Sequence, residues 1–256
     1  MRFAAGVEYD GQGFAGWQMQ AGVPTVAGHL IGALSTIADR PVSLICAGRT
    51  DAGVHASGQV IHFDTPVQRS SRAWLFGTNA NLPRQISLSW VRPVPQHFHA
   101  RFSALARTYR YEIRNRPARS ALYAGRALWQ REALDTGAMN AAAAQLCGEH
   151  DFSSFRAADC TSRSAVRRIT RLRIERSGER IWIEVTANAF LLHMVRNLVG
   201  ALLATGRGGL APAEFPRLLQ ARDRRLAPPM AAAEGLYLAQ VDYDPAFGIP
   251  AAADPL

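Results

Sequence analysis

The segment Gly48–Ala56, with the sequence GRTDAGVHA, holds the residue types best suited to chemistry. Arg49 lies two positions before Asp51 in it, and glycines flank the pair. A short glycine-flanked loop between two strands presents its side chains at the edge of a sheet, where a carboxylate can act as a nucleophile or a base. Taken by itself, the segment fits a surface turn with an ion pair better than an active site.

Arg196 makes a catalytic role for this segment more plausible. It lies in Phe190–Leu203, which is apolar on most sides. A buried arginine needs an anionic partner, and no acidic residue lies between positions 187 and 213. The partner must come from elsewhere, and Asp51 is our candidate, since an arginine within about 4–6 Å would keep it ionised. The alternative is an arginine whose head group reaches the surface.

A third candidate is the strand that contains ARTYRY, residues 106–111. With a period of two, Arg107 and Tyr109 share one face and Arg110 lies on the other. A tyrosine beside arginines suits stacking on an unpaired base next to phosphate contacts. An ordinary amphipathic strand explains the pattern equally well.

Two other patterns carry no chemistry. The run Gly11–Gly16 matches GxGxxG, but no helix opens at Gly16, so a pyrophosphate would lack a helix N-terminus to bind. The cysteines, Cys46, Cys147 and Cys160, are far apart, and the histidines show no metal-ligand spacing. We therefore expect no metal, no cofactor and no disulfide framework, as suits a reducing cytosol.

The elements that must position these residues repeat in two halves. We expect strands at 3–9, 42–47, 58–64 and 85–94 with helices at 25–38 and 70–79. The second half repeats the order with strands at 104–113, 166–175, 181–186 and 236–243, helices at 135–147 and 190–205, and an extra helix at 212–222. The order β-α-β-β-α-β is that of ferredoxin-like domains.

This pattern predicts an α+β fold of two ferredoxin-like halves, whose sheets pack side by side around a central basic cleft. The expected boundaries are 1–103, which holds the Asp51 loop, 104–245, and a flexible tail at 246–256. A cleft between two sheets is a natural ligand site.

The charge indicates a polyanionic partner. The net charge is +9, the chain has no lysine, and every cationic side chain at neutral pH is therefore an arginine. Nucleic acid is the first candidate. The start of the chain has no signal-peptide plan and no segment is long and apolar enough to span a membrane, so we expect a cytoplasmic protein.

The sequence resembles the bacterial tRNA pseudouridine synthase A family over nearly its whole length. The resemblance is carried by motifs in the family's order: VEYDG (7–11), GWQ (16–18), GRTDAGVH (48–55), FHARFS (98–103), DFSSFR (151–156), HMVRN (193–197) and AEGLY (233–237).

The resemblance implies a role for each matching residue. Asp51 falls on the catalytic aspartate, Tyr109 on the active-site tyrosine, and Arg196 on the arginine that pairs with the aspartate. Arg49 falls on the residue associated with base flipping, and Leu236 on an apolar residue of the uracil pocket.

The implied reaction is the isomerisation of uridines at positions 38, 39 and 40 of the tRNA anticodon stem-loop, without a cofactor. The resemblance also implies a homodimer and the fold described above. Beside these residues, Arg49, Arg107 and Arg110 are our hypothesis for phosphate contacts. One departure is Ala27-Gly28, where the family commonly has a glutamine and an acidic residue, which affects the stability of that turn only.

Two rival functions remain open from the sequence. A non-catalytic RNA-binding protein would share the charge and the cleft but would not need Asp51. A glycosidase-like hydrolase would normally need two carboxylates, and only Asp51 stands in a motif.

Overall fold

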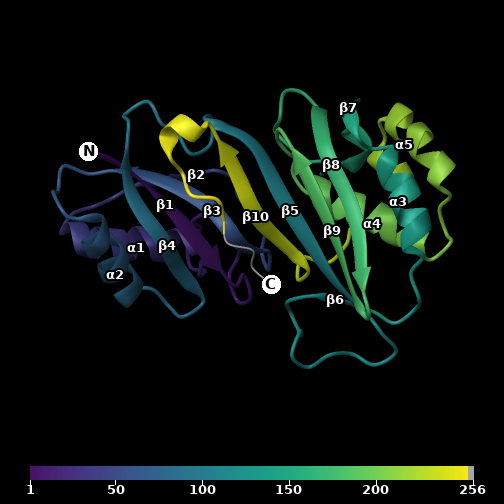
Figure 1. Ribbon diagram of the computed structural model, residues 1–256, viewed down its shortest axis with the longest axis horizontal. Helices are drawn as coiled ribbons and strands as arrows, with labels where there is room; N and C mark the ends of the chain where they lie inside the picture. Colours follow the sequence, from purple (N-terminus) through teal and green to yellow (C-terminus); the bar gives the residue numbers. More distant parts are fainter. Residues whose placement is uncertain (253–256) are drawn as a thin grey trace. The chain divides into compact units, whose positions relative to one another are not determined.

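The computed structural model describes residues 1–252, which form a mixed α+β structure (Figure 1). The chain divides into two compact units, residues 1–107 with the segment from Tyr237 onward, and residues 108–236. The chain passes from the first unit to the second within β5 (Ala104–Asn115) and returns to the first unit at the start of β10 (Leu236–Tyr243).

The first unit is built on a mostly antiparallel sheet. Its elements are β1 (Arg2–Tyr9), α1 (Val26–Ala38), β2 (Leu44–Cys46), β3 (His55–Asp64), α2 (Ser71–Ala80), β4 (Ile86–Val94) and most of β10 (Leu236–Tyr243). The strand order is β4-β1-β3-β10, and β2 pairs with β3. Trp74 of α2 is fully buried against the rings of Phe3 and Phe63 on the sheet.

Strand β3 changes neighbours along its length. Its beginning, at His55 and Ala56, pairs in parallel with β10, whereas its end, at Ile61–Phe63, pairs with β2. The loop 47–54 connects the end of β2 to the start of β3, where β3 pairs with β10. We assigned the last strand to the second half, but residues 237–243 belong to the first unit because of this pairing with β3.

The strands of the second unit follow the order β5-β9-β8-β7, with the short β6 beside β5. Its elements are β5 (Ala104–Asn115, which starts in the first unit), β6 (Leu128–Gln130), α3 (Thr136–Ala144), β7 (Gly148–Asp151), β8 (Val166–Ser177), β9 (Arg180–Ala187), α4 (Met194–Gly206) and α5 (Phe215–Ala221). Short 3₁₀ helices lie at Ser153–Phe155, Pro212–Glu214 and Arg224–Leu226.

The helix ends follow local signals. Asp135 is confirmed as the N-cap of α3, since its side chain accepts the N–H of Ala138 at 2.9 Å. The expected helix 190–205 starts later, at Met194, because His193 takes a left-handed conformation with φ 60°. Among the described residues, no helix has both the length and the apolar character to cross a membrane.

The expected flexible tail 246–256 is partly described. Pro245–Phe247 forms a 3₁₀ turn, and the ring of Phe247 packs 5.1 Å from that of Phe98. Residues 253–256 lie outside the described residues.

Candidate active site

The loop 47–54, which carries Asp51, is fixed at its start by a buried glutamine. Gln59 of β3 is 0% exposed. Its Nε2 donates to the carbonyl oxygen of Gly48 at 2.6 Å, and its Oε1 accepts the N–H groups of Gly48 at 3.4 Å and Val60 at 3.2 Å. The N–H of Ala47 donates to the carbonyl oxygen of Val60 at 2.8 Å. The loop therefore enters from β2 with a defined geometry.

The middle of the loop is held at Thr50. This residue is buried, and its hydroxyl lies 2.7 Å from the Tyr9 hydroxyl, where either oxygen can donate. The N–H of Trp17 donates to the Thr50 carbonyl oxygen at 3.0 Å. Gly53 takes a φ of 77°, which suits a residue without a Cβ, and the N–H of Val54 returns to the Asp51 carbonyl oxygen at 3.2 Å.

The glycine-rich run 11–16 packs on this loop. A Cβ at Gly16 would meet the Thr50 carbonyl oxygen at 2.9 Å and the Ala52 nitrogen at 3.0 Å, and a Cβ at Gly11 would collide with the Val54 carbonyl. No helix opens at Gly16, since α1 begins at Val26. The GxGxxG pattern thus allows two backbone segments to approach closely.

Asp51 and Arg49 lie on either side of the buried Thr50. The Asp51 residue is half-buried and the Arg49 residue is exposed. The backbone around Asp51 is fixed on both sides, so the point from which its side chain extends has a restricted position. Such restriction is what positioning catalysis requires.

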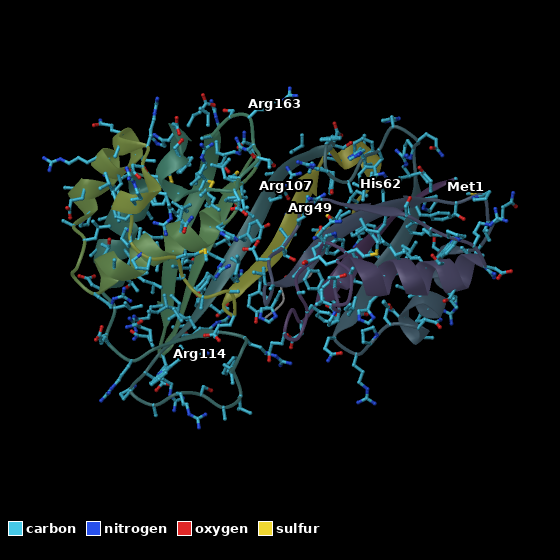
Figure 2. All side chains as sticks on the ribbon, turned by 180° about the vertical axis from the view of Figure 1, so that it is seen from behind. Met1, Arg49, His62, Arg107, Arg114 and Arg163 are labelled. Atoms are coloured by element: carbon cyan, nitrogen blue, oxygen red, sulfur yellow. The ribbon has the colours of Figure 1, made fainter. Side chains whose placement is uncertain are left out.

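Arg107 binds the backbone beside the loop. Its Nη2 donates to the carbonyl oxygens of Arg101 at 2.6 Å and Ala47 at 3.1 Å, and its Nη1 reaches that of Ala104 at 3.5 Å. In Figure 2 the labels of Arg107 and Arg49 stand next to each other in the first unit. Arg107 therefore supports Ala47, the first residue of the Asp51 loop. The phosphate contact of Arg107 stays a prediction.

Cys46, the last residue of β2, is not activated. Burial raises the pKa of its thiol to about 11, and the opposing charges of Arg49 and Arg101 only partly offset this effect. The thiol therefore stays protonated at neutral pH, and Asp51 is the better candidate nucleophile.

The second unit carries the predicted tyrosine. Tyr109 of β5 is 9% exposed, and its ring meets that of Phe190 edge to face, with the centroids 5.1 Å apart. The neighbouring Thr108 hydroxyl lies 2.8 Å from that of Thr186 on β9. These contacts set the orientation of β5 around Tyr109.

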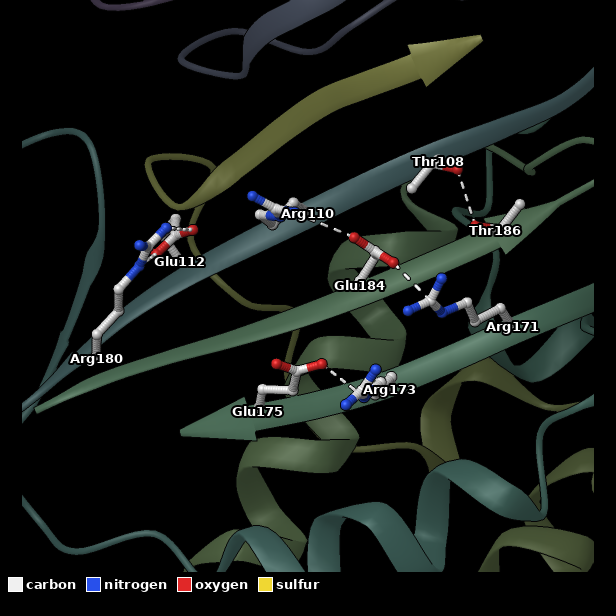
Figure 3. A network of polar contacts seen from close by, with 9 residues as sticks. All are labelled: Thr108, Arg110, Glu112, Arg171, Arg173, Glu175, Arg180, Glu184 and Thr186. Carbon is white, nitrogen blue, oxygen red and sulfur yellow. Dashed lines mark hydrogen bonds and ion pairs between the residues drawn. The ribbon is translucent and has the colours of Figure 1, made fainter. Parts of the chain in front are cut away.

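Arg110 lies in a network of charged pairs on the same sheet (Figure 3). Its Nη2 is 3.2 Å from a carboxylate oxygen of Glu184, whose other oxygen is 3.5 Å from the Nε of Arg171. Nearby, Arg180 binds Glu112 with two hydrogen bonds of 2.8 and 2.9 Å. Glu184 already neutralises part of the charge of Arg110, and the phosphate contact of Arg110 stays a prediction.

Arg196 lies in the first turn of α4 and is half-buried. Its Nε donates to the Ala231 carbonyl oxygen at 3.0 Å, and its own carbonyl oxygen accepts the N–H of Ala231 at 3.1 Å. Burial raises the pKa of Tyr111; the Glu234 charge adds to this and the Arg196 charge opposes it. Both charges therefore lie close to Tyr111.

Leu236 follows this segment and is 4% exposed. Its N–H donates to the Ala233 carbonyl oxygen at 2.9 Å, and the Tyr111 hydroxyl donates to that of Ala232 at 2.9 Å. The segment 231–236 therefore ties the start of α4 to β5.

The predicted residues are divided between the two units. Asp51, Arg49 and Arg107 belong to the first, and Tyr109, Arg110, Arg196 and Leu236 belong to the second. The pairing of Asp51 with Arg196 stays a prediction. Among residues 1–252, no three side chains of the metal-ligating kinds are grouped to hold a metal ion.

The residues that fix the loop were not predicted from the sequence. Gln59 and Gly16 bind or touch its backbone and Tyr9 binds the Thr50 hydroxyl, but none of the three stood out as a candidate for chemistry. The available signal was the polar Gln59 immediately before the apolar run Val60-Ile61, since a glutamine inside a buried strand must satisfy its amide.

A carboxylate on a fixed loop, in a chain with a net charge of +9, suits chemistry on a polyanionic substrate such as a nucleic acid. A family model described as tRNA pseudouridine synthase matches residues 5–103 and 142–244. The chain belongs to this family.

Curated relatives agree over almost the whole chain. The tRNA pseudouridine synthase A of Methylococcus capsulatus is 53% identical over 97% of this chain and 92% of its own length. The protein of the same name from Nitrosococcus oceani is 50% identical over 100% and 99% of the two chains, and that from Pseudomonas aeruginosa is 51% identical over 97% and 88%.

Proposed function

We propose that the protein isomerises uridine to pseudouridine at positions 38, 39 and 40 of the tRNA anticodon stem-loop, with Asp51 as the essential carboxylate. The observation that carries this proposal is an identity of 50–53% to three proteins named tRNA pseudouridine synthase A over 97% or more of the chain. The fixed loop around Asp51 supports its catalytic role.

The reaction breaks the C1′–N1 glycosidic bond and forms a C1′–C5 bond. C5 loses its proton and N1 gains one, so substrate and product have the same composition and no cofactor is consumed. The target base must first leave its stack before a side chain can reach C1′.

The Asp51 carboxylate can serve in two ways. As a nucleophile it attacks C1′ and expels the uracil anion, and C5 of the turned uracil then displaces the carboxylate. As a base it removes the C2′ proton while the uracil anion leaves, which forms a glycal. C5 then adds to C1′ and the carboxyl group returns the proton to C2′.

The other predicted residues have supporting roles in this proposal. Tyr109 stacks on the uracil, Leu236 lines its pocket, and Arg196 keeps Asp51 ionised and aligned. Arg49 assists base flipping and contacts the RNA. Arg107 and Arg110 are proposed phosphate contacts, although both also bind groups within the protein.

The proposal includes an arrangement that the resemblance implies. Two ferredoxin-like halves would line a basic cleft that receives the tRNA, in a cytoplasmic homodimer without metal or cofactor. The net charge of +9 supports a polyanionic substrate.

The proposal is tested by locating the product. Unmodified tRNA transcripts with uridine at 38, 39 or 40 are incubated with the protein, treated with a carbodiimide that marks pseudouridine, and copied by reverse transcriptase. We expect stops at these positions only. Stops confined to other positions would contradict the proposed specificity, and release of free uracil would identify a hydrolase instead.

A further inference from the structure

The segment 114–132, here called the basic loop, is a strongly positively charged part of the second unit. It holds five arginines and one glutamate, so its net charge is +4 out of +9 for the whole chain. Most of it forms the excursion between β5 and β6 (Figure 1), and Figure 2 labels Arg114 where this excursion leaves β5. The family model does not cover it, since the matched segments end at 103 and resume at 142.

The base of the basic loop is closed by side chains. Asn115 Nδ2 donates to the carbonyl oxygens of Gln130 at 3.0 Å and Glu132 at 2.6 Å. The indole N–H of Trp129 donates to the carbonyl oxygen of Arg116 at 2.9 Å. A loop closed in this way loses little conformational entropy when it binds a ligand.

The five arginines differ in their surroundings. The Arg114 guanidinium lies 3.4 Å from the centre of the Tyr123 ring, and Arg116 pairs with Glu179 at 3.1 Å. Arg119 and Arg131 are exposed, and within residues 1–252 neither has an ion pair or a side-chain hydrogen bond. These two positive charges are available to a ligand, in contrast to Arg107 and Arg110.

We propose that the basic loop is an additional RNA-binding surface, and that Arg119 and Arg131 contact phosphates of the tRNA besides the contacts made at the target base. The planar guanidinium matches a phosphate group, and a polyanionic partner fits a net charge of +4. This inference rests on the proposed function, because it takes tRNA as the ligand.

The test is the salt dependence of tRNA binding by full-length protein. The double variant Arg119→Gln with Arg131→Gln removes two charges from the basic loop. The double variant Arg69→Gln with Arg84→Gln is the matched control, since both residues are exposed, lie in the first unit, and likewise have no ion pair or hydrogen bond within residues 1–252. Filter binding of an unmodified tRNA transcript is measured from 50 to 300 mM salt.

We expect the basic-loop variant to bind about 10-fold more weakly at physiological salt, with a slope of log Kd against log salt reduced by about 1 to 2. Its rate at saturating tRNA should match wild type. A dissociation constant and slope equal to those of the control would overturn the inference. So would a changed oligomeric state in size-exclusion chromatography, which would make the loop a contact between copies. Wild-type turnover is measured alongside, so failure of the proposed function is recognised separately.

Discussion

Substitution of Gln59 should separate the positioning of the Asp51 loop from the binding of tRNA. Its amide forms hydrogen bonds with both backbone groups of Gly48. We predict that Gln59→Met lowers the rate at saturating tRNA by at least about 10-fold, because the Asp51 loop loses its fixed entry, and changes the Kd for tRNA less than about 2-fold. Single-turnover kinetics and filter binding measure the two quantities.

A matched control exists in the same unit. The Asn79 amide binds both backbone groups of Leu88, at 2.7 and 2.9 Å, and thus resembles Gln59 away from the loop. Gln59→Met and Asn79→Ala should each lose about 1–3 kcal/mol of stability. Asn79→Ala should nevertheless keep the wild-type rate at saturating tRNA. The rate of Gln59→Glu, relative to that of wild type at the same pH, should rise as the pH falls, because a protonated carboxyl group can donate to the carbonyl oxygen of Gly48. Equal rate losses at 59 and 79 would contradict the positioning role.

His62 is a residue with a predicted effect on stability. It is 3% exposed, its Nδ1 accepts the N–H of Ala100 at 3.0 Å, and burial, aided by the Arg2 charge, lowers its pKa to about 4. The unfolded chain, with a histidine pKa near 6.5, takes up this proton first as the pH falls. The contribution of neutral His62 to the free energy of unfolding is therefore fully present above about pH 6.5. It falls by up to about 3 kcal/mol as the pH is lowered to about 4.

Urea unfolding at pH 7.5, 6.0 and 5.0 measures this loss. His62→Asn places an acceptor near the position of Nδ1 without a titrating group, so its free energy of unfolding should fall less steeply over this range. If wild type and variant lose stability in parallel, the buried histidine is not the source.

At the scale of elements, the glycine-rich run 11–16 should control the shape of the Asp51 loop. Gly16 has φ 88° and touches the loop backbone, whereas Gly13 has φ 79° and open space around a Cβ. An alanine at either position costs about 1–2 kcal/mol from the left-handed conformation. We predict that only Gly16→Ala lowers turnover, by more than about 10-fold, because it displaces Thr50 and Ala52. Thermal unfolding and single-turnover rates of both variants check this, and equal turnover would contradict it.

The elements were largely predictable from the sequence, because periodicity and caps are local. The helices at 26–38 and 71–80 and the hairpin formed by β8 and β9 lie close to their expected positions. The start of α4 was missed, since nothing in Phe190–His193 signals a left-handed His193. The grouping of β10 with the first unit was missed as well, because strand partners are set by contacts between distant segments.

The candidate site was predictable only in part for the same reason. Asp51 stood out through its glycine-flanked loop and through the motifs shared with a family. The hydrogen bonds from Arg107 to three carbonyl oxygens could not be predicted from the sequence. The acceptors belong to residues 47, 101 and 104, which only the fold brings together.

At the scale of the whole molecule, the chain is an all-arginine polycation with a net charge of +9. Its predicted chemistry is divided between two units, with Asp51 on one and Tyr109 and Arg196 on the other. Either unit alone lacks a proposed catalytic component. Activity should therefore depend on the whole chain, and tRNA binding should weaken steeply with salt.

Tritium release from uracil C5 shows whether the protein isomerises uridine in tRNA and whether the reaction needs Asp51. An unmodified tRNA transcript labelled with tritium at uracil C5 is incubated with wild-type protein and with Asp51→Asn. C5 loses its hydrogen only when the new bond forms, so the release of tritium reports the isomerisation. We predict release by wild type and none by the variant, with similar tRNA binding by both. No release by folded, tRNA-binding wild type would contradict the isomerase activity. Equal release by both proteins would contradict the essential role of Asp51.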